Sequence, residues 1–135
     1  MAERNIRIFV VDGVRTVRDE LCQLIDASDK FILAGRAGTL AEAVRKLENS
    51  EAQVLLLDLD LHELDDLALL KRFCEVHPEI KVLGTGNKWE DPILRPAFGA
   101  GVSGYINKPF EEWQLAQSMK ELFGFFPNSI LLNSR

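Results

Sequence analysis

Two spacings of apolar residues alternate along this chain: short continuous runs, and stretches with apolar residues every three or four positions. Short runs are typical of strands, whereas the second spacing is typical of amphipathic helices. The predicted strands cover residues 6–11, 31–36, 54–57, 80–85 and 104–107. Because strands and helices alternate throughout, the pattern predicts a parallel sheet covered by helices on both faces, the (βα)5 class of α/β fold.

Apolar stripes and capping residues mark the helices. Thr39 and Glu42 have the spacing of a capping box at the start of the second helix. The third helix is predicted over 64–76, and the fifth over 111–123 with Gly124 as its stop. The fourth is expected to open at Asp91-Pro92 and to be short or bent, because Pro96 removes a helical hydrogen bond. In the first helix the residues expected to face the core are Val14, Val17, Leu21, Leu24 and Ile25.

Length and composition indicate one globular domain. The chain has 135 residues, of which 47% are hydrophobic and 27% charged, so it can bury a core without disulfides. We assign residues 1–124 to the domain and 125–135 to an apolar tail or the start of a linker. Cys22 and Cys74 fall on apolar helix positions and are expected to be buried, reduced thiols.

The charge and the hydropathy of the chain limit where the protein is expected to be located and which partners it is expected to bind. No apolar run is long enough to cross a bilayer, and the amino terminus lacks the apolar core of a signal peptide, so we expect a cytoplasmic protein with no membrane partner. The net charge is -5 and the pI is near 5.1. This acidic balance offers no electrostatic footprint for nucleic acid, and we expect no direct contact with DNA by this domain.

Polar side chains follow the ends of four predicted strands. Asp12 ends the first strand, Asp58 the third and Thr85 the fourth, and Lys108 follows the fifth. In open α/β sheets the ligand crevice lies at the carboxyl ends of the strands. Two carboxylates, a hydroxyl and an ammonium are therefore predicted to converge there, which is the set of groups needed to hold Mg²⁺ and a phosphoryl group.

The same segments resemble a known family, the receiver domains of bacterial two-component response regulators. The resemblance covers roughly residues 5–123, and its segments occur in the family's order. It implies a flavodoxin-like sheet with strand order 2-1-3-4-5. The matching segments are Ile-Phe-Val-Val-Asp12, Val-Leu-Leu-Leu-Asp58, Val-Leu-Gly-Thr85-Gly86 and Gly101-Val-Ser-Gly-Tyr105-Ile-Asn-Lys108-Pro109.

The resemblance also implies roles for residues. Asp58 would be the phosphoacceptor, receiving a phosphoryl group from a sensor histidine kinase or a phosphotransfer protein. Thr85 and Lys108 would contact the phosphoryl oxygens, and Tyr105 would change rotamer in response. The fourth helix, fifth strand and fifth helix would form the switch surface and a possible homodimer contact. Such a domain signals through phosphorylation and is not an enzyme in its own right. The resemblance also implies that the Lys108-Pro109 peptide bond is cis.

One departure from the family concerns the metal. Receivers usually carry two adjacent acids after the first strand, whereas this chain has Asp12-Gly13, and Leu61-His62-Glu63 replaces the usual Met-Pro-Gly stretch. Mg²⁺ would then depend on Asp12, Asp58 and Asp60 with water, which predicts weak binding. The alternative is a pseudo-receiver, held in one conformation by a Lys108–Asp58 ion pair and acting without phosphorylation.

Two further alternatives come from other classes. Leu-Leu-Leu-Asp58-Leu-Asp60 resembles the nucleophile and acid/base pair of haloacid-dehalogenase-type phosphatases. In that family the nucleophile follows the first strand of the core, and here two strand–helix units precede it. A flavodoxin-like cofactor binder would need a phosphate-binding loop after the first strand, and none is visible there.

Overall fold

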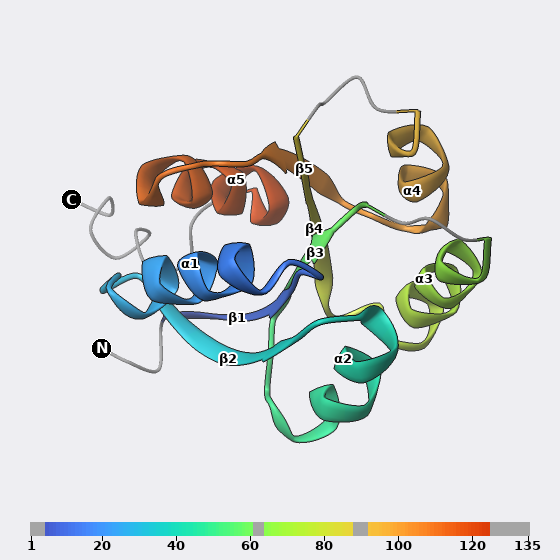
Figure 1. Ribbon diagram of the computed structural model, residues 1–135, viewed down its shortest axis with the longest axis horizontal. Coiled ribbons are helices and arrows are strands. Elements are labelled where there is room, and N and C mark those ends of the chain that lie inside the picture. The colour runs from blue at the N-terminus through green and yellow to red at the C-terminus, as the bar shows by residue number, and fades with distance from the viewer. Residues whose placement is uncertain (1–4, 61–63, 88–91, 125–135) are drawn as a thin grey trace.

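The structure is a computed structural model that describes residues 5–60, 64–87 and 92–124. Five strands and five helices alternate along these residues (Figure 1). The strands are β1 (Ile6–Val11), β2 (Phe31–Ala37), β3 (Val54–Asp58), β4 (Lys81–Gly86) and β5 (Gly104–Asn107). The helices are α1 (Arg15–Asp26), α2 (Leu40–Lys46) with the 3-10 turn η2 (Leu47–Asn49), α3 (Leu64–Val76), α4 (Leu94–Ala100) and α5 (Glu112–Phe123).

The strands form one parallel sheet in the order β2-β1-β3-β4-β5. β3 is the central strand, and its first four residues, Val-Leu-Leu-Leu, are all buried. A strand covered on both faces needs apolar side chains on both, which is why this run shows no alternation. The predicted fold class and strand order are confirmed.

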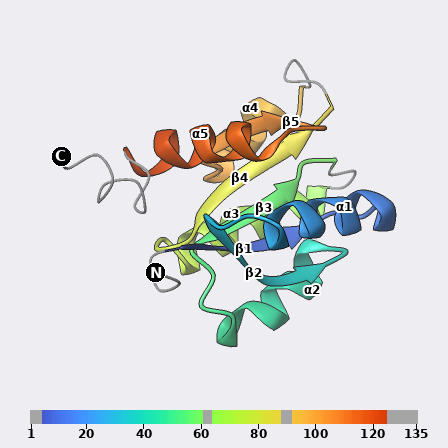
Figure 2. The ribbon, with the colours of Figure 1, turned by 90° about the vertical axis from the view of Figure 1, so that its left-hand side faces the viewer.

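Helices cover the sheet in two layers (Figures 1 and 2). On one face α1 and α5 pack against the sheet, burying residues such as Ile8, Leu56 and Leu115. On the other face α2, α3 and α4 bury a second cluster that includes Phe9, Leu55 and Leu70. The connection through α1 therefore runs over one face and the connections through α2, α3 and α4 over the other, and because all strands are parallel the carboxyl ends of β1, β3, β4 and β5 lie together at one edge.

One departure from the predicted helices concerns Val14. It was expected in the apolar stripe of the first helix, but α1 begins at Arg15 and Val14 is its N-cap, with 52% of its surface exposed. The other members of the stripe face the core: Leu21 and Ile25 are buried, and Val17 and Leu24 pack against them. The spacing of apolar residues alone therefore placed the start of this helix one residue too early.

The fourth helix is short, as predicted, but it begins later than predicted. Ile93 is its N-cap and Leu94 its first residue, while Asp91 lies outside the described residues. Pro96 is therefore in the first turn, where a backbone N–H has no intrahelical acceptor in any case. The proline fits there because it removes no helical hydrogen bond, and the helix ends at Ala100 before Gly101, which has a φ of 123°.

The second helix forms only one of the two hydrogen bonds of the predicted capping box. Thr39 accepts a hydrogen bond from the Glu42 N–H at 3.1 Å, as expected for an N-cap. The Glu42 carboxylate instead accepts from the Gly38 N–H at 2.9 Å, one residue before the cap.

At the end of α5, Gly124 has a φ of 75°, so the predicted glycine stop is confirmed.

Pairing between β3 and β4 continues one residue past Asp58. The Leu59 N–H donates to the Thr85 carbonyl at 2.9 Å, and the Leu59 side chain is buried. It packs against Gly84 so closely that a β-carbon at residue 84 would lie 2.4 Å from a Leu59 methyl carbon. Gly84 thus provides the space in which Leu59 is seated.

Both cysteines are free thiols in helices α1 and α3. Cys22 is buried, whereas Cys74 is only partly buried, so the expectation of two buried thiols holds for the first alone. Burial raises the pKa of both thiols, which lowers the fraction of reactive thiolate at neutral pH. None of the helices within the described ranges is long and apolar enough to span a bilayer.

Candidate functional site

Asp12 follows β1 and is fully buried. Its Oδ1 accepts a hydrogen bond from the Val14 N–H at 2.9 Å. Its Oδ2 accepts from the Lys108 ammonium at 2.7 Å, across 96 residues of sequence. A carboxylate without solvent needs partners for its charge, and Asp12 has a backbone donor on one oxygen and a cation on the other.

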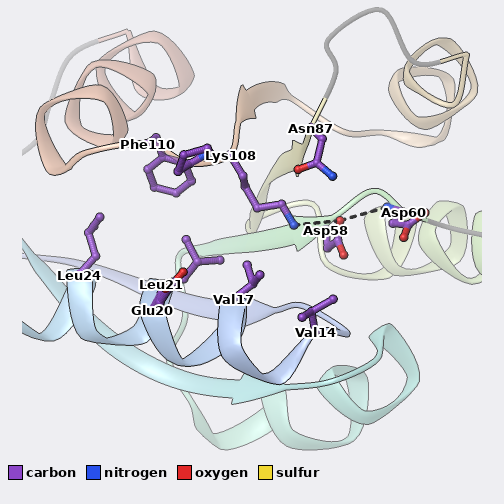
Figure 3. A pocket seen from close by; sticks show the side chains of 11 residues that line it. Val14, Val17, Glu20, Leu21, Leu24, Asp58, Asp60, Asn87, Lys108 and Phe110 are labelled. Carbon is purple, nitrogen blue, oxygen red and sulfur yellow. Dashed lines mark hydrogen bonds and ion pairs between the residues drawn. The ribbon is translucent and has the colours of Figure 1, made fainter.

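Asp58 is the last residue of β3, and its side chain is 12% exposed. One carboxylate oxygen lies 3.4 Å from the Lys108 ammonium and accepts from the Asp60 N–H at 3.2 Å (Figure 3). Burial, and then the negative charge of Asp12, raise the pKa of Asp58 above the ordinary aspartate value in spite of Lys108. The carboxylate is therefore held close to two charges while one side of it stays open to solvent.

Lys108 follows β5 and joins the two acids. Its ammonium reaches both carboxylates, at 2.7 Å from Asp12 and 3.4 Å from Asp58. Burial acts to lower the pKa of Lys108, but the hydrogen bond to Asp12 and the charge of Asp58 outweigh burial, so this pKa is raised. Lys108 is accordingly a permanent cation at neutral pH, and the Lys108-Pro109 peptide bond is cis, as expected.

Thr85 lies directly beside Asp58 in the sheet, since the two residues are partners in the β3–β4 register. It is 1% exposed, so a solvated surface role is excluded. Its hydroxyl oxygen has no hydrogen-bond partner in the described part of the chain. A buried hydroxyl left without a partner costs about 1–3 kcal/mol, so an acceptor brought to this edge of the sheet would relieve that cost.

Tyr105 of β5 is near the site but outside the charged cluster. Its hydroxyl donates to the Asn107 side-chain oxygen at 2.8 Å and lies over Gly86, the residue after Thr85. A β-carbon at residue 86 would come within 2.7 Å of the hydroxyl oxygen. The absence of a side chain at Gly86 therefore allows Tyr105 to occupy this position.

Among the described residues, three hollows meet at Asp58 and Asp60, and both side chains line all three. The first, of about 410 Å³, runs between α1 and the segment after β5, with Leu24 on one wall and Phe110 and Lys108 on the other (Figure 3). The second, of about 140 Å³, contains Tyr105 and Gly86. The third, of about 360 Å³, lies on the Gly13 side and is also lined by Asp66.

Gly13 leaves open space where the family has its second acid. A β-carbon built there would meet nothing closer than the Gly38 carbonyl oxygen at 3.7 Å. In the described ranges, no three His, Cys, Asp or Glu side chains lie close enough together to hold a metal ion. The carboxylates of Asp58 and Asp60 beside open hollows still suit Mg²⁺, which keeps several waters and needs only one or two carboxylates.

The structure brings the predicted acids Asp12 and Asp58, the hydroxyl of Thr85 and the ammonium of Lys108 to one edge of the sheet, with Asp60 two residues beyond Asp58. Sequence reasoning missed Arg18, whose guanidinium donates to the Asp12 carbonyl oxygen at 2.7 Å. It also missed the close packing of Leu59 against Gly84 beside the site. The one sequence feature that could have indicated this contact is the position of Arg18 in the first turn of α1, close to the loop that follows Asp12.

Comparison with known proteins agrees with this geometry. Residues 8–120 match the response regulator receiver domain. The chain belongs to this family. Receiver domains are phosphoacceptor signalling domains, so the chain is a signal-transduction domain with a histidine kinase as its implied partner. The family match decides against the haloacid-dehalogenase and cofactor-binding alternatives.

Relatives of this receiver are transcriptional regulators. It is similar to the DNA-binding transcriptional activator DevR/DosR of Mycobacterium tuberculosis, with 27% identity over 117 residues, 87% of this chain and 54% of that protein. It is 30% identical over 114 residues to the transcriptional regulatory protein YdfI of Bacillus subtilis, 84% of this chain and 53% of that protein. The receiver thus spans about half the length of these relatives.

Solved structures share the fold. A putative pilus assembly-related protein from Burkholderia pseudomallei superposes with a TM-score of 0.78 at 19% identity, covering 92% of each chain. The response regulator domain of Thermotoga maritima CheB superposes with a TM-score of 0.68 at 26% identity, covering 90% of this receiver and 92% of that domain.

Proposed function

We propose that this receiver accepts a phosphoryl group on Asp58 from a histidine kinase or a phosphotransfer protein. The observation that supports the proposal is the position of Asp58 at the end of β3, open to three hollows, with Lys108 at 3.4 Å and Thr85 beside it in the sheet. A carboxylate oxygen of Asp58 attacks the phosphorus of a phosphohistidine. The phosphorus–nitrogen bond breaks, and the imidazole leaves with the electron pair.

Lys108 and Thr85 then bind the transferred group. The Lys108 ammonium is close enough to Asp58 to pair with a phosphoryl oxygen, and the Thr85 hydroxyl gains the acceptor that it lacks. Mg²⁺ would be held by Asp58 and Asp60 together with water, and when bound it neutralises the phosphoryl oxygens. We expect weak binding, because Gly13 contributes no carboxylate.

Thr85 and Tyr105 would carry the effect of phosphorylation from Asp58 to the surface of the receiver. Movement of Thr85 toward a phosphoryl oxygen would pull the end of β4, and Tyr105 packs over the next residue, Gly86. We propose that the surface formed by α4, β5 and α5 changes in response and contacts an output partner or a second copy of the receiver. With a net charge of -5, contact with DNA would come from another domain, as in a cytoplasmic transcriptional regulator.

A second candidate is a pseudo-receiver that signals without phosphorylation. The observation that favours it is the existing ion pair between Lys108 and Asp58 together with the missing acid at Gly13. In that case the partner would recognise the unphosphorylated surface, and Asp58→Asn would leave partner binding intact.

The test is incubation with acetyl phosphate and MgCl₂, followed by intact-mass measurement. The receiver should gain one phosphoryl group in a Mg²⁺-dependent manner, and beryllofluoride should shift the NMR signals of Thr85 and Tyr105. Asp58→Asn should gain none, whereas the matched variant Asp29→Asn, an exposed aspartate in the α1–β2 loop, should react like the wild type. A folded wild type that gains no group at high Mg²⁺ would support the pseudo-receiver.

A further inference from the structure

The hollow on the Gly13 side is lined by carboxylates and by no cation. Asp58 and Asp60 border it from the end of β3, and Asp66 borders it from the first turn of α3. None of the described residues that line it is a lysine, an arginine or a histidine. Negative charge around a concave surface raises the local concentration of cations, so this hollow favours a cation over an anion or a neutral ligand.

The positive charges nearby belong to other parts of the site. Lys108 lines the first hollow and not this one, and its ammonium is shared between Asp12 and Asp58. Arg18 donates to the Asp12 carbonyl oxygen and does not line the hollow either. Within the described ranges the Asp66 carboxylate has no ion pair and no hydrogen bond, so its charge is left uncompensated.

The size of the hollow suits an ion that keeps its water. The volume is about 360 Å³, which has room for an ion with several water molecules. In the described part of the chain, no three acids lie close enough together to hold a metal ion directly. Mg²⁺ keeps several waters and needs contact with only one or two carboxylates. Further acids around the hollow can then act through the waters of the ion.

Asp66 borders the space that a second acid after β1 would fill. A β-carbon at Gly13 would meet nothing closer than 3.7 Å, and Gly13 and Asp66 line the same hollow. Thr85, buried beside Asp58 in the sheet, has a hydroxyl without a partner among the described residues. That orphaned hydroxyl is independent of the acids, and it also indicates that this edge of the sheet receives a ligand.

We propose that Asp66 compensates for the acid that Gly13 lacks, by holding through water a Mg²⁺ ion bound at Asp58. Asp60 borders the same hollow and adds its negative charge. The inference deepens the proposed phosphoacceptor function and rests on it for the place of the ion at Asp58. It adds to that site a residue of α3, eight positions beyond the phosphoacceptor.

The plainer role for Asp66 is structural. An acid in the first turn of a helix stabilises the helix through the partial positive charge of its amino terminus. Both roles predict that Asp66→Asn loses stability in metal-free buffer, so that loss does not separate them. The structural role predicts no change in Mg²⁺ affinity, whereas the proposed role predicts a clear weakening.

The experiment is a Mg²⁺ titration followed by NMR, without any phosphoryl donor. Asp66→Asn should weaken binding about tenfold, the scale on which groups that act through a metal's direct ligands alter its affinity. The matched variant is Glu75→Gln, which removes the same charge from an exposed residue of α3 that lines none of the three hollows. At physiological ionic strength, where distant charges are screened, its affinity should stay within about twofold of wild type. Equal effects of the two variants would overturn the proposal.

The place of the ion can be measured with Mn²⁺, which shares the preference of Mg²⁺ for oxygen ligands and broadens nearby NMR signals. The amide signals of Thr39 and Asp66, which border the hollow, should broaden first. The signals of Leu24 and Phe110, which line only the first hollow, should stay sharp. The reverse pattern would place the ion in the first hollow and contradict the role of Asp66.

Failure of this inference is distinguishable from failure of the phosphoacceptor function. MgCl₂ should raise the urea denaturation midpoint of wild type, because an ion that binds the folded state stabilises it, and should raise that of Asp66→Asn less. A folded wild type that binds neither ion, or an equal rise in both proteins, would exclude the role of Asp66. Absence of labelling by acetyl phosphate, with Mg²⁺ bound as described, would contradict the phosphoacceptor function alone.

Discussion

The hydroxyl of Tyr105 occupies the space that a side chain at Gly86 would need, since a β-carbon there would lie 2.7 Å from the hydroxyl oxygen. Gly86→Ala should therefore displace the tyrosine ring. The contact is with the end of a flexible side chain, so we expect a stability loss of about 1 kcal/mol or less, at the low end for overpacking.

Displacement of the ring can be observed directly, because Tyr105 is the single tyrosine of the chain. A sample labelled with ¹³C-tyrosine gives one ring spin system, and Gly86→Ala should shift it. The matched control is Gly99→Ala, where a β-carbon meets nothing within 4 Å. An unchanged ring signal in Gly86→Ala would show that Tyr105 does not depend on the missing side chain.

The convergence of the site could be predicted from sequence, because parallel strands place their carboxyl ends at one edge. Asp12 and Lys108 are 96 residues apart, and that rule alone placed them together. The rule could not predict which acid is nearer to the ammonium. That distance depends on the side-chain conformation of Lys108 and on the donors, Val14 and Arg18, that fix Asp12.

Other features depend on packing between strands, which a sequence pattern does not contain. Leu59 lies beyond the predicted strand 54–57, yet it is buried over Gly84 of the neighbouring strand. That contact requires the β3–β4 register, which aligns Leu57 with Gly84 and Asp58 with Thr85. Val14 was misplaced for a different reason: an apolar residue in a cap position keeps the helical spacing without joining the helix.

The contact between Gly84 and Leu59 predicts a stability effect. A β-carbon at residue 84 would lie 2.4 Å from a Leu59 methyl carbon, and both residues are buried. Gly84→Ala should destabilise the fold by about 1–3 kcal/mol, the usual cost of overpacking a core. Urea denaturation measures the loss, and adding Leu59→Val should recover part of it. A loss no larger than that of Gly99→Ala would contradict the packing argument.

Gly13→Asp should strengthen Mg²⁺ binding. The backbone at Gly13 has room for a side chain, with the nearest atom 3.7 Å from the added β-carbon, and a carboxylate there would face the hollow that Asp58 and Asp60 line. We expect a gain of about tenfold or more, the scale on which even indirect partners alter metal affinity. Calorimetric titration with MgCl₂ measures it, with Gly13→Asn as the uncharged control. Equal affinities of the Asp and Asn variants would exclude the added carboxylate as a ligand.

The raised pKa of Asp58 predicts a pH-dependent gain in stability when its charge is removed. Burial and the charge of Asp12 raise this pKa, so the folded state binds a proton more tightly than the unfolded state. Ionisation of Asp58 therefore opposes folding, and its cost appears as the pH rises from the unfolded aspartate pKa through the folded one. In metal-free buffer, Asp58→Asn should be more stable than wild type at pH 7.

That gain should shrink toward zero as the pH falls below about 4, the ordinary aspartate pKa, because the wild-type carboxyl is then protonated in both states. Denaturation midpoints of the two proteins across this pH range provide the measurement. The exposed variant Asp29→Asn serves as the control. A difference between Asp58→Asn and wild type that stays constant with pH would mean that packing, and not charge, accounts for it.

The Leu59 N–H that donates to the Thr85 carbonyl at 2.9 Å has a mechanical consequence. It extends the β3–β4 ladder past Asp58, so the residues before and after Asp58 both pair with β4 and the α-carbon of Asp58 stays where the sheet places it. The ends of β4 and β5 are tied to each other in the same way, because the Lys108 N–H donates to the Gly86 carbonyl at 2.7 Å. A rearrangement at this edge would then move these two ends together, with β3 as the fixed frame.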